Sequence, residues 1–477
     1  MKRTRKDKNT VPDGVGSMTT SKYIYRKIYE QLKKDILAHK YHSHERLPSK
    51  RLLSRELGVS VNSVKHAYEQ LVAEGYVYTK ERQGYFIESL NELVVNPRHE
   101  EAVIEEEATT EVTSAFRYSL SHMSTNLSVF PVETWLKLQR QVLKSSRDVL
   151  SEIPHIKGPL ALRRAIAKLV SFKRGIDCHP EQIILASGAN VLVQKLLALL
   201  NDGMKVGVEN PGYARMRQVI QQHCRVIPIP LDDKGVRMSE IHQMQPNIML
   251  TTPSHQFPLG MIMPISRRIE LLNWATQTAS YVIEDDYDSE FKYGTDNIPS
   301  LFSLDQNERV IYLGTFSKTL SPSMRMSYMI LPKHLVEPFQ QMYQETISDV
   351  STMTALTLAA MIDSGDYEKY IRKMRHIYSQ QRIQVVHQLK VVFGRKIKIY
   401  DVKAGLHFVV DVESPYTYEE IERRARDRGL ELYTLNRFMM HSIAHEQGKT
   451  FIIGFANIDT GILPATIQCL YDVLFEE

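Results

Sequence analysis

The chain has 477 residues, of which 43% are hydrophobic and 24% are charged, and its formal net charge is +5. This length exceeds one ordinary domain and suits one small and one large domain. We expect no membrane partner, because no apolar run approaches the roughly 18 residues of a membrane-spanning helix and the basic start at 1–8 is not followed by a signal-peptide core. The cysteines are widely spaced and form no metal or redox motif, so a cytoplasmic location is expected.

The positive charge is concentrated at the N-terminal end. Residues 1–88 contain 18 Lys and Arg against 10 Asp and Glu, a net charge of +8, which leaves −3 for the rest of the chain. A nucleic-acid-binding module is expected to be basic, because binding phosphates releases their counterions. A basic tail that only keeps the chain soluble would have the same composition, so charge alone leaves both interpretations open.

Three helices and a hairpin are predicted in the first ninety residues. Apolar residues recur at helical spacing in three segments, and two short alternating runs follow them. The helices are predicted over 21–38, 48–58 and 61–74, and the strands over 76–78 and 85–87. Helix, turn, helix and wing in this order form the winged helix-turn-helix layout, which is mainly α.

In this layout the second helix of the motif enters the DNA major groove by its N-terminal end. Residues 49–51 and the hairpin tip are therefore expected at backbone phosphates, and residues 60–65 at base edges. A solvated helix face is the alternative for each of them. The candidate DNA-binding residues are Ser49, Lys50, Arg51, Ser60, Asn62, Ser63, Lys65 and, at the hairpin tip, Arg82.

The segment 89–115 differs in composition from both of its neighbours. It contains the acidic run Glu105–Glu107 and few large apolar residues. Such a segment cannot bury enough surface to offset the entropy of ordering it. We predict a flexible acidic linker here, between a DNA-binding domain at 18–88 and a larger domain at 116–477.

Beyond residue 115, helical segments alternate with short β-branched runs. This alternation predicts an α/β domain whose largely parallel sheet is covered by helices on both faces, and ligands of such sheets bind beyond the carboxyl ends of the strands. The runs predicted as strands are Gln182–Ala186, Val206–Glu209, Asn247–Thr251, Tyr281–Glu284 and Val310–Gly314.

Two of these strand ends carry residues that suit a phosphorylated pyridine cofactor. Gly188, Ala189 and Asn190 lead into a helix whose first backbone amides can bind a phosphate. After the run at 281, Asp285 can hold a protonated pyridine nitrogen and Tyr287 can reach a ring hydroxyl. A structural turn and a solvated acidic loop are the respective alternatives.

A third strand end carries Lys318, which follows Thr315 and Ser317 and precedes Arg325. A lysine amine condenses with the aldehyde of pyridoxal 5'-phosphate (PLP), and hydroxyls and a guanidinium can hold the dianionic phosphate beside it. Most lysines are solvated surface charges. Here the acidic loop and the lysine segment suit two ends of one cofactor, so we predict Lys318 as the residue that forms the Schiff base with PLP.

Residues from about 115 to 477 resemble fold-type I aminotransferases, and the whole chain is similar to the MocR/GabR group of bacterial transcription regulators, which join a GntR-type winged helix to such a domain. Within the group the sequence most resembles the GABA-responsive GabR type. The resemblance implies a PLP-dependent fold with a smaller C-terminal α+β lobe. The matching segments are 47–49, 74–76, 84–86, 211–213, 252–258, 284–291 and 314–320.

The resemblance also implies roles for further residues and for partners. Tyr213 would stack on the PLP ring, and Arg215 and Arg437 would hold the carboxylate of the effector. It implies an amino compound as effector, with GABA the first candidate, which forms an external aldimine in place of Lys318. It further implies a homodimer that reads repeated half-sites in double-stranded operator DNA.

The sequence departs from catalytic aminotransferases at two places. Phe257 stands where those enzymes have an asparagine beside the ring hydroxyl, and the segment Phe451–Ala456 lacks their near-terminal arginine. Val61 also replaces an arginine found in many GntR domains. The two departures from the aminotransferases favour a sensor with poor transaminase turnover, whereas Val61 removes one presumed DNA contact, so the operator sequence is not implied by the resemblance. An active aminotransferase with an appended DNA-binding domain, and an enzyme fold that has lost its cofactor, remain as alternatives.

Overall fold

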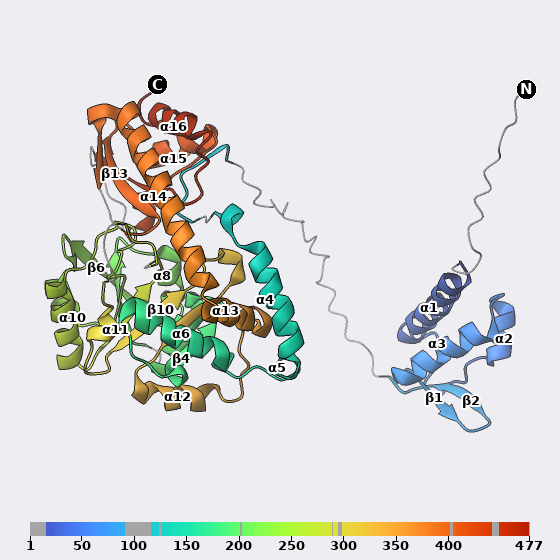
Figure 1. The fold of residues 1–477 in the computed structure, drawn as a ribbon. Helices are drawn as coiled ribbons and strands as arrows, with labels where there is room; N and C mark the ends of the chain where they lie inside the picture. Colours follow the sequence, from blue (N-terminus) through green and yellow to red (C-terminus); the bar gives the residue numbers. More distant parts are fainter. Residues whose placement is uncertain are drawn as a thin grey trace, which may run out of the picture. The chain divides into compact units, whose positions relative to one another are not determined.

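The computed structural model divides the chain into two compact units, residues 1–110 and 111–477, which are described separately below (Figure 1). The predicted linker at 89–115 lies outside the described residues from position 91 onward. Side chains are described from residue 24. The described residues are 16–90, 116–123, 126–200, 203–288, 290–293, 298–400, 404–440 and 448–476.

The N-terminal unit contains three helices and a two-stranded hairpin, in the order expected from the sequence. The elements are α1 (Gly16–Leu37), α2 (Lys50–Glu56), α3 (Val61–Ala73), β1 (Val77–Lys80) and β2 (Gly84–Ile87). The two strands pair antiparallel, as a wing does. This arrangement is the predicted winged helix-turn-helix.

One small apolar core holds the N-terminal unit together. Leu32 and Ile36 of α1 pack against Val64 and Leu71 of α3, and all four side chains are buried. Tyr68, also buried, donates a hydrogen bond from its hydroxyl to the carbonyl oxygen of Pro48 at 2.8 Å. The start of α2 is thereby attached to α3, which fixes the turn between the two helices.

The larger unit is built on an eight-stranded sheet with the strand order β4-β11-β10-β9-β8-β5-β6-β7. Strands β10, β9, β8, β5 and β6 are parallel to their neighbours in this series, whereas β11 and β7 are antiparallel to theirs. The sheet is mainly parallel, as predicted. In order across the sheet the strands are Ile183–Ala186, Ser327–Ile330, Val310–Thr315, Tyr281–Asp286, Ile248–Thr251, Lys205–Asn210, Arg225–Asp232 and Gly235–Val236.

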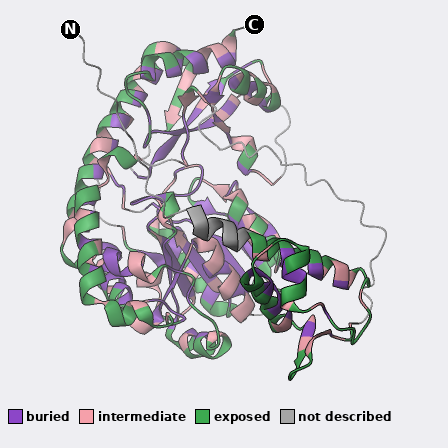
Figure 2. Ribbon diagram, turned by 90° about the vertical axis from the view of Figure 1, so that its right-hand side faces the viewer, coloured by how far each residue is buried: buried purple, intermediate pink, exposed green. Residues whose placement is uncertain are grey.

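Helices cover both faces of this sheet because its central strands are apolar on both sides. Ile184 packs in one cluster with α7, α8 and α12, whereas its neighbour Ile183 packs in another with α6 and α13. Figure 2 shows the central strands as buried between helices with exposed outer faces. The helices of this part are α4 (Val132–Ser145), α5 (Arg147–Ser151), α6 (Leu160–Arg174), α7 (Ala189–Leu200), α8 (Ala214–Gln221), α9 (Met238–Met244), α10 (Ile265–Gln277), α11 (Leu301–Leu304), α12 (Lys333–Tyr343) and α13 (Thr352–Asp363).

A smaller α+β lobe follows in the chain, as the resemblance implied. It contains an antiparallel sheet of order β12-β13-β16-β15, and β3 pairs with β14 beside it. Among the described helices, none is long and apolar enough to cross a membrane. The elements of the lobe are α14 (Asp366–Phe393), β12 (Ile397–Tyr400), β13 (His407–Glu413), α15 (Tyr418–Asp427), β14 (Leu430–Glu431), β15 (Tyr433–Thr434), β16 (Gly448–Gly454) and α16 (Leu463–Phe475), with β3 at Tyr118–Ser119.

Leu71→Ala is expected to destabilise the N-terminal unit by about 2–4 kcal/mol, because it leaves a cavity in the core. The Leu71 side chain is 0% exposed, whereas that of Leu57 in the same unit is 49% exposed. Hydrogen exchange of the amides in α3, followed by mass spectrometry on the whole chain, measures this local stability. The matched control Leu57→Ala is expected to change it by less than about 0.5 kcal/mol, and equal losses in the two variants would contradict the assignment of the core.

Candidate functional site

A cavity of about 230 Å³ lies beyond the carboxyl ends of the parallel strands in the larger unit. Residues that follow β4, β5, β8, β9 and β10 line it, together with residues of the C-terminal lobe and of segment 122–123. It brings together all the predicted cofactor and effector residues except Arg437. Those on its wall are Gly188, Ala189, Asn190, Tyr213, Arg215, Asp285, Tyr287, Thr315, Ser317, Lys318 and Arg325.

One part of the cavity wall is suited to an anion. Gly188 precedes α7 with φ +152°, and a Cβ at this position would lie 2.4 Å from Nη2 of Arg325. The hydroxyl of Ser327 donates to Thr315 Oγ1 at 2.8 Å, and Thr315 in turn donates to Ser317 Oγ at 3.1 Å. Backbone amides at a helix start, hydroxyls and a guanidinium thus converge, and this combination binds phosphate groups.

Asp285 gives another part of the wall its negative charge. Burial, reinforced by the nearby Asp286 and Glu209 carboxylates, raises the pKa of Asp285 to about 7. A cation placed against this carboxylate would be stabilised and would lower its pKa again. The hydroxyl oxygen of Tyr287, two residues further on, lies 3.0 Å from Nδ1 of His255. The pair of Asp285 and Tyr287 therefore suits a ring with a basic nitrogen and a hydroxyl.

Lys318 supplies the one amine among the described residues of the cavity wall. Its Nζ donates a hydrogen bond to the carbonyl oxygen of His122 at 2.9 Å. Burial lowers the pKa of Lys318 to about 8; Arg215 also lowers it, and Asp288 acts in the opposite direction. Near neutral pH a larger fraction of this amine is therefore uncharged than for an ordinary lysine, and the uncharged amine is the nucleophile.

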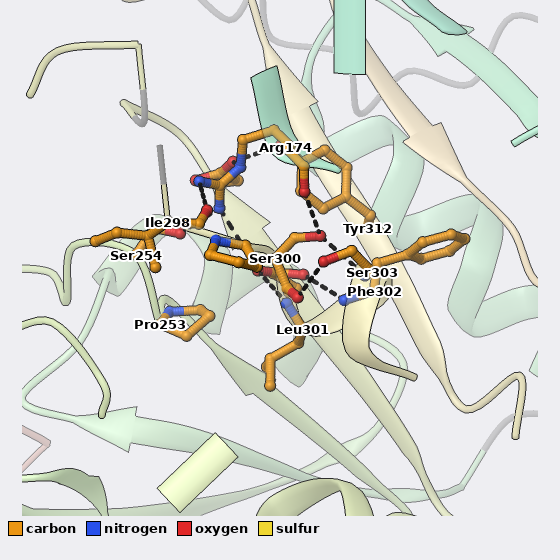
Figure 3. Close-up of polar contacts among 12 residues, drawn as sticks. Arg174, Pro253, Ser254, Ile298, Ser300, Leu301, Phe302, Ser303 and Tyr312 are labelled. Carbon is orange, nitrogen blue, oxygen red and sulfur yellow. Dashed lines mark hydrogen bonds and ion pairs between the residues drawn. The ribbon is translucent and has the colours of Figure 1, made fainter. Parts of the chain in front are cut away.

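A buried polar network below the cavity holds Asp286, the neighbour of Asp285. Arg174 Nε lies 2.8 Å from Asp286 Oδ2, and the hydroxyl of Tyr312 donates to the same carboxylate. Arg174 also donates to Ser254 Oγ at 2.5 Å and to the carbonyl oxygen of Ile298 at 2.6 Å (Figure 3). The network fixes the end of β9 against the loop that follows β8, and both segments carry cavity residues.

His255 lies close to Asp288 and His407, two residues of the cavity wall, and the ligand atoms of the three side chains lie within 4.8 Å of one another. Side chains of this kind at this spacing can hold a metal ion. In the structure, however, Nδ1 of His255 lies 2.8 Å from Asp288 Oδ2, and Nε2 of His407 lies 3.0 Å from the carbonyl oxygen of Pro258. The hydrogen bonds already present use one nitrogen of each histidine.

Arg437 lies outside the cavity lining. Its Nε and Nη2 donate to the two carboxylate oxygens of Glu422 at 2.9 and 3.1 Å, and its guanidinium lies 5.4 Å from the ring centroid of Tyr433. Arg215, the other arginine expected at the effector, lines the cavity and makes no ion pair with any residue in the described ranges. The structure therefore separates the two guanidiniums that the resemblance brings together.

The predicted phosphate contacts in the N-terminal unit lie at the start of α2 and at the hairpin tip. Ser49 caps α2, and its hydroxyl accepts a hydrogen bond from the amide of Leu52 at 3.2 Å. Lys50 extends over the ring of Tyr85, with 5.4 Å between Nζ and the ring centroid. Arg51 and Arg82 are exposed. Two basic side chains are thus fully available at this surface, and Lys50 is partly covered.

The predicted base contacts lie at the start of α3. Ser60 caps this helix by accepting from the amide of Ser63 at 3.1 Å. Asn62 and Lys65 are exposed, and Lys65 lies 3.5 Å from Glu69. Ser63 differs from the expectation because it is buried, with its hydroxyl 2.8 Å from that of Ser60. Without bound DNA, Asn62 and Lys65 are therefore the exposed side chains at the start of α3 whose polar atoms make no capping hydrogen bond.

Sequence reasoning missed several residues of the cavity wall. His122 precedes the large domain's sheet, and Leu406 and His407 come from the C-terminal lobe, far along the chain from Lys318. No local pattern marks such positions. Phe257, by contrast, is placed beside the cofactor ring by the resemblance, and Asp288 stands inside segment 284–291, which the sequence also singled out.

Two family models match this chain. Residues 24–87 match the model described as "Bacterial regulatory proteins, gntR family", and residues 120–437 match "Aminotransferase class I and II". The first range covers the winged helix, and the second contains the cavity. The chain belongs to the MocR type of transcription regulators. The predicted family is thereby confirmed, whereas the special closeness to GabR stays a prediction.

Related proteins match this regulator over nearly its whole length. The Bacillus subtilis protein named "Uncharacterized HTH-type transcriptional regulator YdeL" is 36% identical over 91% of the chain and 93% of its own length. The "Probable rhizopine catabolism regulatory protein MocR" of Rhizobium meliloti is 28% identical over 94% and 93%. The crystal structure of kynurenine aminotransferase from Pyrococcus horikoshii covers 76% of this chain and 91% of its own, with 25% identity and a TM-score of 0.67.

Lys50→Ala is expected to weaken binding to double-stranded DNA of any sequence, because a lysine at a phosphate contributes through charge. The slope of log affinity against log salt concentration should fall by about 1. Fluorescence anisotropy at several salt concentrations measures this slope. Lys34→Ala removes the same charge from an exposed position on α1 and serves as the control. Equal slopes for the two variants would contradict a phosphate contact at Lys50.

Proposed function

We propose that this regulator binds PLP at Lys318 and senses an amino compound, with GABA as the first candidate. The amino group of the effector takes the place of the Lys318 amine at the cofactor. The observation that carries the proposal is the position of the Lys318 amine, which shares one cavity wall with an anion site and with Asp285. When bound, PLP supplies an electrophilic aldehyde that reacts with primary amines.

The residues of the cavity fit PLP at three points. Gly188 leaves room for Arg325 beside the start of α7, where the phosphate would be held. Asp285 would stabilise the protonated pyridine nitrogen, whose positive charge would offset the burial and the neighbouring carboxylates that raise the pKa of Asp285. Tyr213 and Tyr287 line the same cavity and would contact the ring. The kynurenine aminotransferase of similar fold was crystallised in complex with PMP, which supports a cofactor of this class.

The charges of the cavity favour an effector that carries an acid group. Arg215 is a cation on the cavity wall without an ion pair to any described residue. A carboxylate on the effector would provide its counter-ion. Arg437 would add a second guanidinium only after leaving Glu422, to which it donates two hydrogen bonds. GABA combines a primary amine with a carboxylate and therefore meets both requirements.

The function proposed is regulation of transcription, with little transaminase turnover. An effector can shift a protein between two arrangements only by binding one of them more tightly. We infer that effector binding at Lys318 changes how a homodimer presents its two winged helices to operator half-sites. Phe257 on the cavity wall offers no hydrogen-bond donor to the cofactor ring. Steady transamination at about 1–1,000 per second would instead favour an active enzyme.

Lys318→Ala is expected to abolish the absorbance band that PLP forms with a protein amine, because the variant lacks the only lysine among the described residues that line the cavity. Absorbance spectra after incubation with PLP and gel filtration measure this band. Lys168→Ala is the control, since the Lys168 side chain is 75% exposed. A wild type without the band, or a Lys318→Ala variant that keeps it, would refute PLP binding at Lys318.

Gly188→Ala is expected to weaken PLP binding about tenfold or more, equivalent to about 1.4 kcal/mol. The new Cβ would lie 2.4 Å from Arg325 Nη2, at a backbone φ of +152° that favours glycine. Titration with PLP, followed by absorbance, measures the affinity. Gly448→Ala is the control because a Cβ there has no described neighbour within 4 Å. Unchanged PLP affinity in Gly188→Ala would contradict the phosphate position.

A further inference from the structure

Val61 is an apolar residue at the first position of α3, and its side chain is 44% exposed. It lies outside the apolar core of the described N-terminal unit, to which α3 contributes Val64, Ala67, Tyr68 and Leu71. Helix formation does not favour it either, since valine is a β-branched residue of lower helix propensity than alanine. Neither the core nor the helix therefore requires a valine at this position.

The turn before α3 holds the Val61 backbone in a fixed place. The amide of Val59 donates to the carbonyl oxygen of Ser54 at 3.0 Å, and the Ser54 hydroxyl donates to the carbonyl oxygen of Val59 at 2.6 Å. The next residue, Ser60, caps the helix. Because residues four apart lie on one side of a helix, Val61 stands one turn before Lys65, which is also exposed. Val61 thus belongs to the helix start that the winged helix-turn-helix layout places at base edges.

Double-stranded DNA suits this surface better than an apolar protein partner does. Residues 24–87 match the GntR family model, and this family implies DNA binding. The centre of a protein–protein interface is depleted of lysine, whereas Lys65 lies one helical turn from Val61 and Arg51 is exposed near the start of the preceding helix. DNA offers phosphates to these cations and base edges to Val61.

An aliphatic side chain at a base edge favours one of the four bases. In the major groove thymine carries a methyl group, whereas guanine presents two acceptors, cytosine an amino donor, and adenine an acceptor and a donor. A valine side chain cannot hydrogen-bond with these polar groups, so covering them would remove their water without replacement. Covering the thymine methyl group instead removes apolar surface from water.

We propose that Val61 is a specificity-determining residue of this regulator and contacts the 5-methyl group of a thymine in the operator. An arginine at this position would instead select guanine, through hydrogen bonds to O6 and N7. The inference goes beyond the proposed function, since it concerns the DNA sequence that is read and is independent of the cofactor and the effector.

The first measurement identifies the bases that the protein reads. Repeated selection from a random library of double-stranded DNA, with the full chain in the presence of PLP, should give a common sequence with thymine at a fixed position. Val61→Arg should change one such thymine to guanine and leave the other selected positions unchanged. Val391→Arg is the matched control, because it adds the same charge at a valine that is 62% exposed on α14 of the larger unit. It should select the wild-type sequence.

The second measurement removes only the methyl group. Uracil is thymine without its 5-methyl group, so a duplex with uracil at the position that Val61→Arg changes should bind the wild type about fourfold more weakly. Val61→Ser lacks the aliphatic contact and should bind the thymine and uracil duplexes equally, as fluorescence anisotropy measures. Val391→Ser should keep the wild-type difference. If Val61→Arg binds no DNA, uracil is placed at each selected thymine in turn, and the comparison of Val61→Ser with the wild type decides.

Four outcomes would overturn the role of Val61. They are a wild type that selects no common sequence, a Val61→Arg variant that binds DNA and selects the wild-type sequence, a wild type that binds thymine and uracil duplexes equally, and a Val61→Ser variant that keeps the full preference for thymine. The Val61 variants should show the same PLP absorbance band as the wild type. A failure of the base contact therefore leaves that band in place, whereas a failure of the proposed function removes it from the wild type.

Discussion

The buried ion pair between Arg174 and Asp286 is the interaction on which the cavity depends. Three consecutive acids, residues 284–286, end β9 in surroundings of low polarity. Because side chains alternate along a strand, Asp285 faces the cavity whereas Glu284 and Asp286 face the opposite side. There Arg174 lies 2.8 Å from Asp286 and 3.9 Å from Glu284. Without this guanidinium the carboxylates would repel one another, and the chain end that presents Asp285 would not be stable.

The same alternation leaves Asp285 as the acid that a ligand must neutralise. Glu284 accepts hydrogen bonds from the amides of Leu301 and Phe302, both at 3.0 Å, and Asp286 is held by Arg174 and Tyr312 (Figure 3). For Asp285, burial and like charge together raise the pKa to about 7. The protein therefore gives two of these three acids an internal partner and leaves the third for a cation in the cavity, as a protonated pyridine would require.

Local sequence signals predicted the strands and most of the cavity wall, because in a parallel sheet the residues that follow each strand meet at one edge. Lys318, Asp285 and Gly188 could thus be brought together from segments 130 residues apart. The partner of Arg437 and the surroundings of His122 depend on contacts with distant segments, and no spacing in the sequence reports those contacts. Ser63 is a different case: it stands four residues before Ala67 on the buried face of α3, so helical periodicity alone indicated its burial.

The cavity also joins the two parts of the larger unit. Lys318 and Arg215 extend from the edge of the large sheet, whereas His407 belongs to β13 of the C-terminal lobe, and His122 is held against β16 of that lobe at Gly454. A ligand that binds at Lys318 and extends to the wall formed by Leu406 and His407 would therefore contact both parts at once. Its binding free energy depends on their relative position, so it stabilises the arrangement in which both sets of contacts are made. A small amino compound that contacted both parts would thereby have the differential affinity that a ligand-sensing regulator requires.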